Sequence, residues 1–267
     1  MLLRINVSTW KIFVNSRPTF VPASKGDSML RYAFSCFGLF VVSCCVALPT
    51  VSAGDSVKIM SADELKADGF VPLFNGKDLD GWRNPYKHGE AKVVDGEIHL
   101  LADKKFFLVT DKEYSNFKVV VDIHLPEGKA NSGVMFRCHV EPNKAFGYQA
   151  ECDGSDRCWS GGLYDEGRRG WVWPSKKGRS KVKEFLEYEA ESQAFFAKPE
   201  IKTALKRNGW NRYEIECVKD HIVVHLNGIK ITDLMDSTDA KGFIAIQHHG
   251  EKGQTYRFRN LMIKELP

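Results

Sequence analysis

The chain has 267 residues, enough for one large domain or two small ones, and a formal net charge of +4. Residues 1–53 contain five Lys or Arg and one Asp, so the rest of the chain carries 33 basic and 33 acidic residues. The positive charge therefore belongs to the N-terminal segment. No basic stripe remains that would indicate a nucleic-acid partner.

Residues 1–53 have the pattern of a leader, with Met29 as the expected true start of translation. Arg31 supplies a positive charge, Tyr32 to Leu48 form an apolar run, and Val51-Ser52-Ala53 is a small-residue cleavage site. The apolar run is short for a membrane span and ends in small residues. We therefore expect a secretory signal peptide and export to the periplasm or the extracellular space.

Two alternatives remain for the leader, namely an N-terminal anchor helix and a lipoprotein attached at Cys44. In either case residues 54–267 are expected to form a single domain without a transmembrane span. Four cysteines lie in that domain. Export to an oxidising compartment permits disulfides between them, but free buried thiols fit the sequence equally well.

Short strands dominate the elements predicted for this domain. A helix comes first, at Ser61 to Gly69, because a capping Ser is followed three residues later by Glu and the segment ends in Gly. The segments that follow are rich in β-branched and aromatic residues, which is typical of strands. In chain order they are Lys118–Leu125, Ser132–Val140, Gly147–Asp153, Arg212–Lys219, His221–Leu226, Ile229–Leu234, Gly242–His249 and Arg257–Leu266.

A charged insertion, about residues 175–207, separates the two groups of strands and contains two candidate helices, Ser180–Phe196 and Pro199–Gly209. Asn227-Gly228 predicts a tight hairpin between two strands of the second group, because both residues tolerate positive φ. Many short strands joined by turn signals predict an all-β fold, a β-sandwich of antiparallel sheets. A short N-terminal helix and a partly helical insertion complete it.

Three predicted strands combine an apolar face with a face of hydrogen-bonding side chains, because successive strand residues point to opposite sides. The residues expected to pack inward are Val134, Phe136, Cys138, Tyr148, Ala150, Cys152, Ile244 and Ile246. The residues expected on the opposite face are Met135, Arg137, His139, Gln149, Glu151, Asp153, Ala245, Gln247 and His249. If the three strands are neighbours, the second set lines one surface. A solvated outer face joined by ion pairs is the alternative.

The second set supplies candidate catalytic groups. Arg137 could act as a fixed cation that grips an oxygen with two hydrogen bonds. Glu151, Asp153 and His249 are the groups that could move a proton.

The loop after the strand Gly147–Asp153 adds candidate binding residues. Gly161-Gly162 allows a sharp turn or a close backbone approach, and Tyr164 and Asp165 follow it. Trp159 and Trp171 could stack on a sugar ring. Because Trp is also a common core residue, packing in the interior is the alternative for both.

Several stretches together resemble the 3-keto-disaccharide hydrolase domain family, whose activities are also described as 3-keto-glucoside 1,2-lyase and 3-keto-2-hydroxyglucal hydratase. They are Gly69–Trp82, Asn131–His139, Gly147–Ser155, Ser160–Trp171, Trp210–Asp236 and Gly242–Leu266. The resemblance implies a concanavalin A-like jelly-roll sandwich with its site on the concave face. It also implies a carbohydrate substrate, a glycoside oxidised at C3.

The resemblance assigns the site to Arg137, Gln149, Glu151, Asp153, Tyr164, Asp165, Gln247 and His249. A ketone at C3 acidifies the proton on C2, so a base can remove that proton and the C1 substituent can leave before water adds. Glu151 or His249 could be the base. Arg137, Gln247 or a metal ion could polarise the ketone. The cofactor stays open, with a divalent ion held by Glu151, Asp153 and His249 as one option.

Two other functions compete with this interpretation. A laminarinase-type β-glucanase would need the pattern Glu-x-Asp-x-x-Glu. Here Glu151 and Asp153 match it, but Asp156 stands where the acid/base glutamate should be. A non-catalytic, lectin-like carbohydrate-binding module would use the same tryptophans and polar groups without proton transfer. The charged insertion departs from the usual family pattern and is expected to cap the groove. The sequence leaves the oligomeric state open.

Overall fold

The structure is a computed structural model that describes residues 4–5 and 56–267 of the chain. The leader features predicted from the sequence, namely the start at Met29, the signal peptide that ends at Ala53 and the lipid site at Cys44, lie outside the described residues. Among the described residues, no helix is long and apolar enough to cross a membrane.

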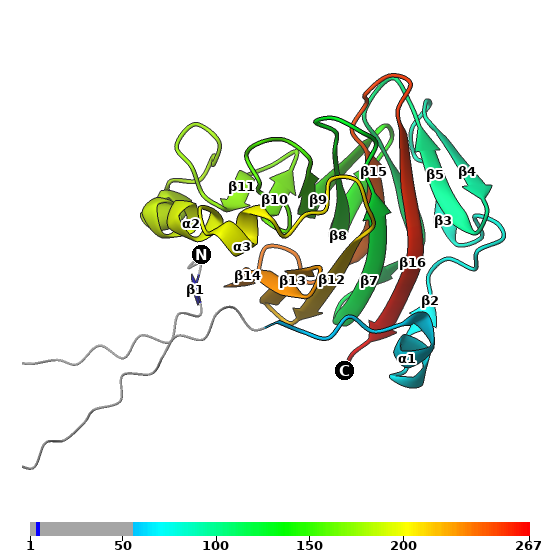
Figure 1. Cartoon of the computed structure of the whole chain (residues 1–267), viewed down its shortest axis with the longest axis horizontal. Coiled ribbons are helices and arrows are strands. Elements are labelled where there is room, and N and C mark those ends of the chain that lie inside the picture. Colours follow the sequence, from blue (N-terminus) through cyan, green and yellow to red (C-terminus); the bar gives the residue numbers. More distant parts are fainter. Residues whose placement is uncertain (1–3, 6–55) are drawn as a thin grey trace, which may run out of the picture. The chain divides into compact units, whose positions relative to one another are not determined.

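Two antiparallel sheets pack face to face, so the predicted β-sandwich with few helices is confirmed (Figure 1). The larger sheet runs in the order β1 (Arg4–Ile5), β14 (Ile229–Met235), β13 (His221–Leu226), β12 (Asn211–Val218), β7 (Phe117–His124), β16 (Thr255–Glu265), β5 (Glu97–Leu101) and β4 (Glu90–Val94), with β2 (Val71–Pro72) paired to β16. The smaller sheet runs in the order β11 (Gly170–Trp173), β10 (Leu163–Glu166), β9 (Lys144–Asp153), β8 (Asn131–Glu141), β15 (Gly242–His248), β6 (Phe106–Tyr114) and β3 (Trp82–Arg83).

The helices lie within the segments predicted for them, but they are shorter than expected. Helix α1 (Ala62–Ala67) begins with a capping box, in which the Ser61 hydroxyl accepts from the Glu64 amide and the Glu64 carboxylate accepts from the Ser61 amide at 2.8 Å. The insertion contains a 3₁₀ helix η1 (Lys183–Tyr188), α2 (Glu189–Phe196) and α3 (Pro199–Lys202). Figure 1 shows α2 and α3 beside the edge strand β11. Their buried residues Phe196 and Ile201 join the main core, which ties the insertion to the sandwich.

The main core fills the space between the sheets and takes the residues that alternation assigns to it. Tyr148, Ala150 and Cys152 of β9 and Ile244 and Ile246 of β15 are all buried in this core. All four cysteines among the described residues are free thiols, so the open choice between disulfides and thiols is resolved in favour of thiols.

Strand β8 departs from regular alternation, and the expected orientation of its second half is wrong. Its register with β9 shifts between Phe136 and His139, and Arg137 has a φ of +45°. In a bulge two residues oppose one, so side chains beyond it exchange faces. Cys138 therefore packs with Met135 on the outer face, away from the core between the sheets.

The same bulge buries Arg137 completely. Its guanidinium donates hydrogen bonds to the backbone carbonyls of Ser115 at 2.7 Å, Lys219 at 2.6 Å and Asp239 at 3.1 Å. These acceptors belong to turns that are far apart in sequence. Arg137 therefore joins three loops at one end of the sandwich.

Candidate functional site

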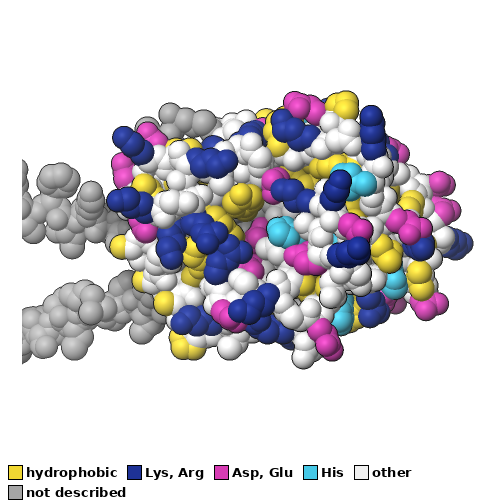
Figure 2. All heavy atoms as spheres, turned by 90° about the horizontal axis from the view of Figure 1, so that it is seen from above, with side chains coloured by type: hydrophobic (Ala, Val, Ile, Leu, Met, Phe, Trp, Pro, Cys, Tyr) yellow, Lys and Arg dark blue, Asp and Glu magenta, His cyan; other side chains and the backbone are white. Residues whose placement is uncertain are grey.

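A pocket of about 180 Å³ opens on the outer face of the smaller sheet. Six of the predicted site residues line it, namely Gln149, Glu151, Tyr164, Trp171, Gln247 and His249. Five lining residues were not predicted, namely Lys105, Asn131, Arg157, Glu166 and Arg179. The volume lies below the ~300 Å³ at which pockets for drug-sized ligands begin, so it suits one small, polar molecule or ring. Figure 2 shows a face on which Asp, Glu and His side chains gather near the middle, with Lys and Arg around them.

Adjacent strands bring the central residues together. β9, β8 and β15 are neighbours in the smaller sheet, as predicted. Gln149 and Glu151 project from β9 and Gln247 from β15. The Gln149 amide nitrogen donates to Glu151 Oε2 at 2.8 Å and to Gln247 Oε1 at 3.4 Å. The predicted convergence is confirmed for these three side chains.

Gly133 of β8 leaves the space that this contact needs. It lies opposite Glu151 in the pairing of β8 with β9. A Cβ atom at Gly133 would lie 2.7 Å from Gln149 Cγ and 2.9 Å from the carbonyl oxygen of Ala150. The absent side chain therefore lets Gln149 lie across β8 toward Gln247.

Replacing Gly133 by Ala is expected to lower the free energy of unfolding by about 1–3 kcal/mol, because the added methyl group overpacks against Gln149 and a backbone carbonyl. Urea-induced unfolding measures the change. Gly209→Ala is the control, since its nearest neighbour atom would be 3.7 Å away, and an effect within about 0.5 kcal/mol is expected there. Equal losses in the two variants would contradict the packing role of Gly133.

Glu151 is the buried carboxylate of the pocket, with 5% of its surface exposed. Asn131 Nδ2 donates to its Oε1 at 2.5 Å, and Gln149 Nε2 donates to its Oε2. Burial raises the pKa of Glu151 to about 7, although both hydrogen bonds act in the opposite direction. A carboxylate with a pKa near neutrality is suited to accept a proton from a weakly acidic carbon.

The Gln149 side chain also contributes an unused acceptor. Its Oε1 is buried and has no hydrogen-bond partner in the described part of the chain. Leaving such a group unpaired costs about 1–3 kcal/mol. A hydroxyl group of a bound ligand would satisfy this acceptor.

His249 follows the last residue of β15 and lies at the rim of the pocket, half exposed. Its Nδ1 is 2.8 Å from Glu251 Oε1, which fixes the ring and leaves Nε2 available for a ligand. The neighbouring His248 points the other way and packs between Phe106 and Tyr256, as its position on the strand predicts.

Aromatic side chains form one wall, but only some of the predicted ones reach the pocket. Trp171 and Tyr164 line it and meet edge to face, with ring centroids 5.3 Å apart. Trp159 is buried in the main core behind Trp171, at a centroid distance of 4.8 Å. Core packing is therefore observed for Trp159, while Trp171 belongs to the main core and also lines the pocket.

Asp153 and Asp165 do not line the pocket, because arginines occupy their carboxylates. Asp153 is buried and accepts from Arg157 Nε at 2.9 Å. Asp165 is buried and accepts from Arg168 Nε at 2.8 Å and from Arg169. Arg137 is likewise absent from the pocket lining.

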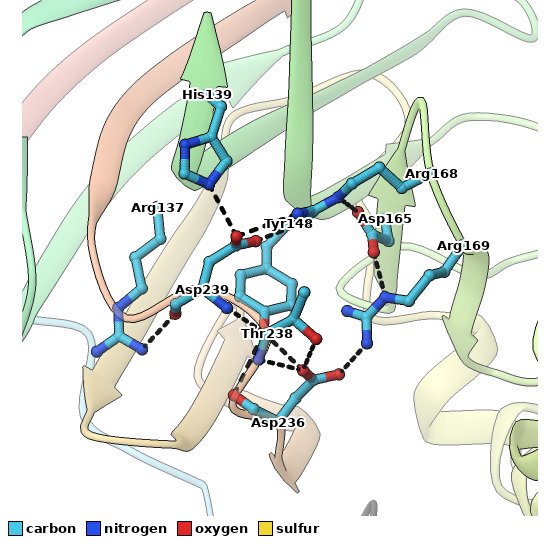
Figure 3. Close-up of polar contacts among 9 residues, drawn as sticks. All are labelled: Arg137, His139, Tyr148, Asp165, Arg168, Arg169, Asp236, Thr238 and Asp239. Atoms are coloured by element: carbon cyan, nitrogen blue, oxygen red, sulfur yellow. Dashed lines mark hydrogen bonds and ion pairs between the residues drawn. The ribbon is translucent and has the colours of Figure 1, made fainter. Parts of the chain in front are cut away.

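Figure 3 shows the network around Asp165. Arg168 bridges Asp165 to Asp239, and Arg169 bridges Asp165 to Asp236, with an Nη1 to Oδ2 distance of 2.8 Å. These contacts join the β10–β11 hairpin to the segment between β14 and β15. Since that hairpin carries Tyr164, Glu166 and Trp171, the network holds one wall of the pocket in place.

All five unpredicted lining residues lie on loops or at strand ends, where alternation is a weak guide. Lys105 precedes β6 and reaches across to Glu166, with an Nζ to Oε1 distance of 2.7 Å. Arg179 belongs to the charged insertion, so the insertion forms part of the rim. Asn131 is the first residue of β8. By alternation it shares the outer face of the sheet with Gly133 and Met135, so it could have been predicted.

The residues proposed for a metal ion do not all converge. Asp153 faces Arg157, whereas Glu151 and His249 line the pocket. Within residues 56–267, no group of three or more His, Cys, Asp or Glu side chains has a geometry that could hold a metal ion.

Comparisons with known proteins give the family and the fold of the chain. The family model of the 3-keto-alpha-glucoside-1,2-lyase-like domain matches residues 69–264. No curated protein matches the chain. A candidate glycosyl hydrolase from Parabacteroides distasonis ATCC 8503 is 21% identical, with a TM-score of 0.51 over 78% of this chain and 99% of that one. This likeness shows a shared fold and nothing finer.

Two further solved structures are similar at TM-scores below 0.5. A second candidate glycosyl hydrolase from the same organism is 23% identical, with a TM-score of 0.48 over 74% of this chain and 99% of that one. The carbohydrate-binding module CBM66 from Bacillus subtilis is 16% identical, with a TM-score of 0.49 over 69% of this chain and 96% of that one. We draw no functional conclusion from either.

Proposed function

Because the chain belongs to the 3-keto-α-glucoside-1,2-lyase-like family, we propose that it cleaves glycosides whose sugar ring carries a ketone at C3, by elimination between C1 and C2. The observation that carries the proposal is Glu151, a buried carboxylate in a small polar pocket, with a pKa raised to about 7. Such a group is a general base poised near neutral pH.

The reaction begins at C2. The C3 ketone acidifies the C2 proton, and Glu151 accepts that proton while the electron pair moves to the C3 oxygen to give an enediolate. When the ketone forms again, a double bond appears between C1 and C2 and the bond from C1 to the aglycone oxygen breaks. The aglycone leaves as an alcohol after it takes up a proton. Addition of water across the new double bond then gives net hydrolysis.

The other side chains of the pocket can bind the substrate through atoms that are available for a ligand. The unpaired Oε1 of Gln149 accepts a sugar hydroxyl, and Gln247 beside it holds a second one. His249 presents Nε2 at the rim, where it can give a proton to the leaving oxygen. Tyr164 and Trp171 form an aromatic wall against a face of the ring.

An isotope experiment tests the elimination route. The purified domain is incubated in D₂O with an aryl 3-keto-glucoside, and the product is analysed by NMR, with a blank lacking enzyme to correct for spontaneous exchange. We expect deuterium at C2 of the sugar product and no turnover of the glucoside that has not been oxidised. Product without deuterium at C2 would contradict the proposal.

The two competing functions are tested by separate experiments. Calorimetric binding of unmodified sugar without turnover of the 3-keto-glucoside would support a lectin-like module. Hydrolysis of an unoxidised β-glucan that is lost in Asp156→Asn would support a laminarinase-type enzyme. The structure places Asp156 on the surface, paired with Lys129, and outside the pocket lining.

We also propose that the enzyme is exported, on the basis of the leader pattern in residues 1–53. N-terminal sequencing of the protein recovered from outside the cytoplasm tests this. A chain that starts near residue 54 is expected, whereas a full-length chain retained in the cytoplasm would contradict export.

A further inference from the structure

The pocket holds a fixed cation at Arg157, in the loop between β9 and β10. Its Nε donates to Asp153 Oδ2 at 2.9 Å and to Ser155 Oγ at 3.3 Å. The centre of its guanidinium lies 5.5 Å from the ring centroid of Trp159 and 5.5 Å from that of Trp171. One buried carboxylate and two aromatic rings thus set the position of the charge.

The outer edge of the Arg157 guanidinium remains available to a ligand. Among the described residues, no acceptor takes a hydrogen bond from Nη1 or Nη2, and neither atom is a buried, unpaired group. Asp153 accepts a hydrogen bond from Nε, so the planar guanidinium of Arg157 can present its two terminal nitrogens, Nη1 and Nη2, to a ligand in the pocket.

The loop that carries Arg157 is itself tied down. Arg207, at the end of the charged insertion, donates to the carbonyl oxygens of Gly154 and of Ser155, the latter at 3.0 Å. Asp156 pairs with Lys129 at 2.6 Å. A donor on a restrained loop needs little reorganisation when charge develops on the ligand, which is the condition for strong electrostatic stabilisation.

The other cations in or near the pocket do not combine a fixed position with free hydrogen-bond donors. Arg137 is buried on backbone carbonyls away from the pocket, and the Lys105 ammonium is paired with Glu166. Arg179 lines the pocket but is exposed, and in the described part of the chain its guanidinium has no partner that would fix it. Arg157 is the pocket cation that combines a fixed position with free donors.

We propose that Arg157 is the catalytic cation that stabilises the negative charge on the C3 oxygen when Glu151 removes the C2 proton. The inference rests on the proposed function. C2 and C3 are adjacent atoms, so the base and the oxyanion stabiliser must face neighbouring parts of the same pocket, as Glu151 and Arg157 do. The charge of Arg157 also lowers the pKa of Glu151, against the larger effect of burial, so the two groups interact electrostatically.

Arg157→Ala is expected to lower kcat on the 3-keto-glucoside by about 10²–10³-fold with a smaller change in KM, because the contact strengthens in the transition state. Added guanidinium ion is expected to restore part of the rate. Loss of the positive charge should also move the acidic limb of the kcat/KM profile to higher pH, since Glu151 then holds its proton more tightly. Arg83→Ala is the matched control, because Arg83 pairs with the exposed Asp111 and lies outside the pocket lining. Its kcat should stay within threefold of the parent, without rescue.

A kcat of Arg157→Ala within threefold of the parent, or a loss that appears only in KM and is not rescued, would overturn the assignment. If Arg157→Ala does not fold, as judged by thermal unfolding, Arg157→Lys replaces it. The lysine ammonium cannot donate two parallel hydrogen bonds as a guanidinium does, so a kcat loss of at least tenfold is expected. Full activity of Arg157→Lys would overturn the assignment.

Failure of this inference is distinguishable from failure of the proposed function. If the parent enzyme places deuterium at C2 and Glu151→Gln does not, while Arg157→Ala is fully active, only the role of Arg157 is wrong. If the parent enzyme places no deuterium at C2, the proposed function is wrong and the role of Arg157 falls with it.

Discussion

Replacing Glu151 by Gln is expected to lower kcat on a 3-keto-glucoside by about 10²–10⁴-fold, because the amide keeps the shape of the side chain but cannot accept the C2 proton. Steady-state kinetics with the purified variant measure the loss. Thermal unfolding checks that the fold persists. Glu90→Gln is the control, since this glutamate is exposed on β4, pairs with Lys92 and lies outside the pocket lining, and its activity should stay within threefold of the parent.

The pH dependence supplies a second measurement on the same residue. The base must be ionised, and the pKa of Glu151 is raised to about 7. The ratio kcat/KM of the parent enzyme should therefore rise as the pH increases through about 7 and level off above it.

His249→Ala separates the two candidate bases. If Glu151→Gln kept full activity while His249→Ala lost it, the base would be His249.

Replacing Asp165 by Asn is expected to lower the free energy of unfolding by about 3–5 kcal/mol, because a buried ion-pair network loses its central carboxylate. Arg168 and Arg169 then each keep only one acidic partner, Asp239 and Asp236. Asp165 is fully buried and accepts from both Arg168 and Arg169, as Figure 3 shows. Chemical denaturation followed by tryptophan fluorescence measures the change.

Asp111→Asn is the control for Asp165→Asn. Asp111 makes an exposed ion pair with Arg83 at 3.2 Å, and its removal should change stability by less than about 1 kcal/mol. A loss below 1 kcal/mol in Asp165→Asn would show that the network in Figure 3 does not stabilise the fold. Because the network holds the hairpin that carries Tyr164, we also expect a higher KM in any Asp165 variant that remains folded.

The charged insertion connects the fold to the pocket in two places. Arg179 contributes to the rim, and Arg207 holds the loop that carries Arg157. The sequence predicts that this segment caps the groove, and the structure places one of its residues, Arg179, in the pocket lining. Since the insertion is anchored by Phe196 and Ile201 in the main core, its position is part of the fold.

Local sequence patterns determined the sandwich and the centre of the site. A period of two along β9 and β15 places Gln149, Glu151, Gln247 and His249 opposite the core, and the helix at Ser61 follows from its own capping box. These inferences depend only on neighbours along the chain, where backbone geometry fixes the direction of each side chain.

Tertiary structure alone decided which charged side chains remained free for a ligand. Asp165 and Asp153 are taken by arginines, and the bulge at Arg137 turns that side chain away from the pocket. The cation that we propose as catalytic is Arg157, whose position depends on Asp153 and on the contacts that Arg207 of the insertion makes with its loop. Ion pairs and bulges depend on groups brought together from distant parts of the chain, so alternation along one strand could not reveal them.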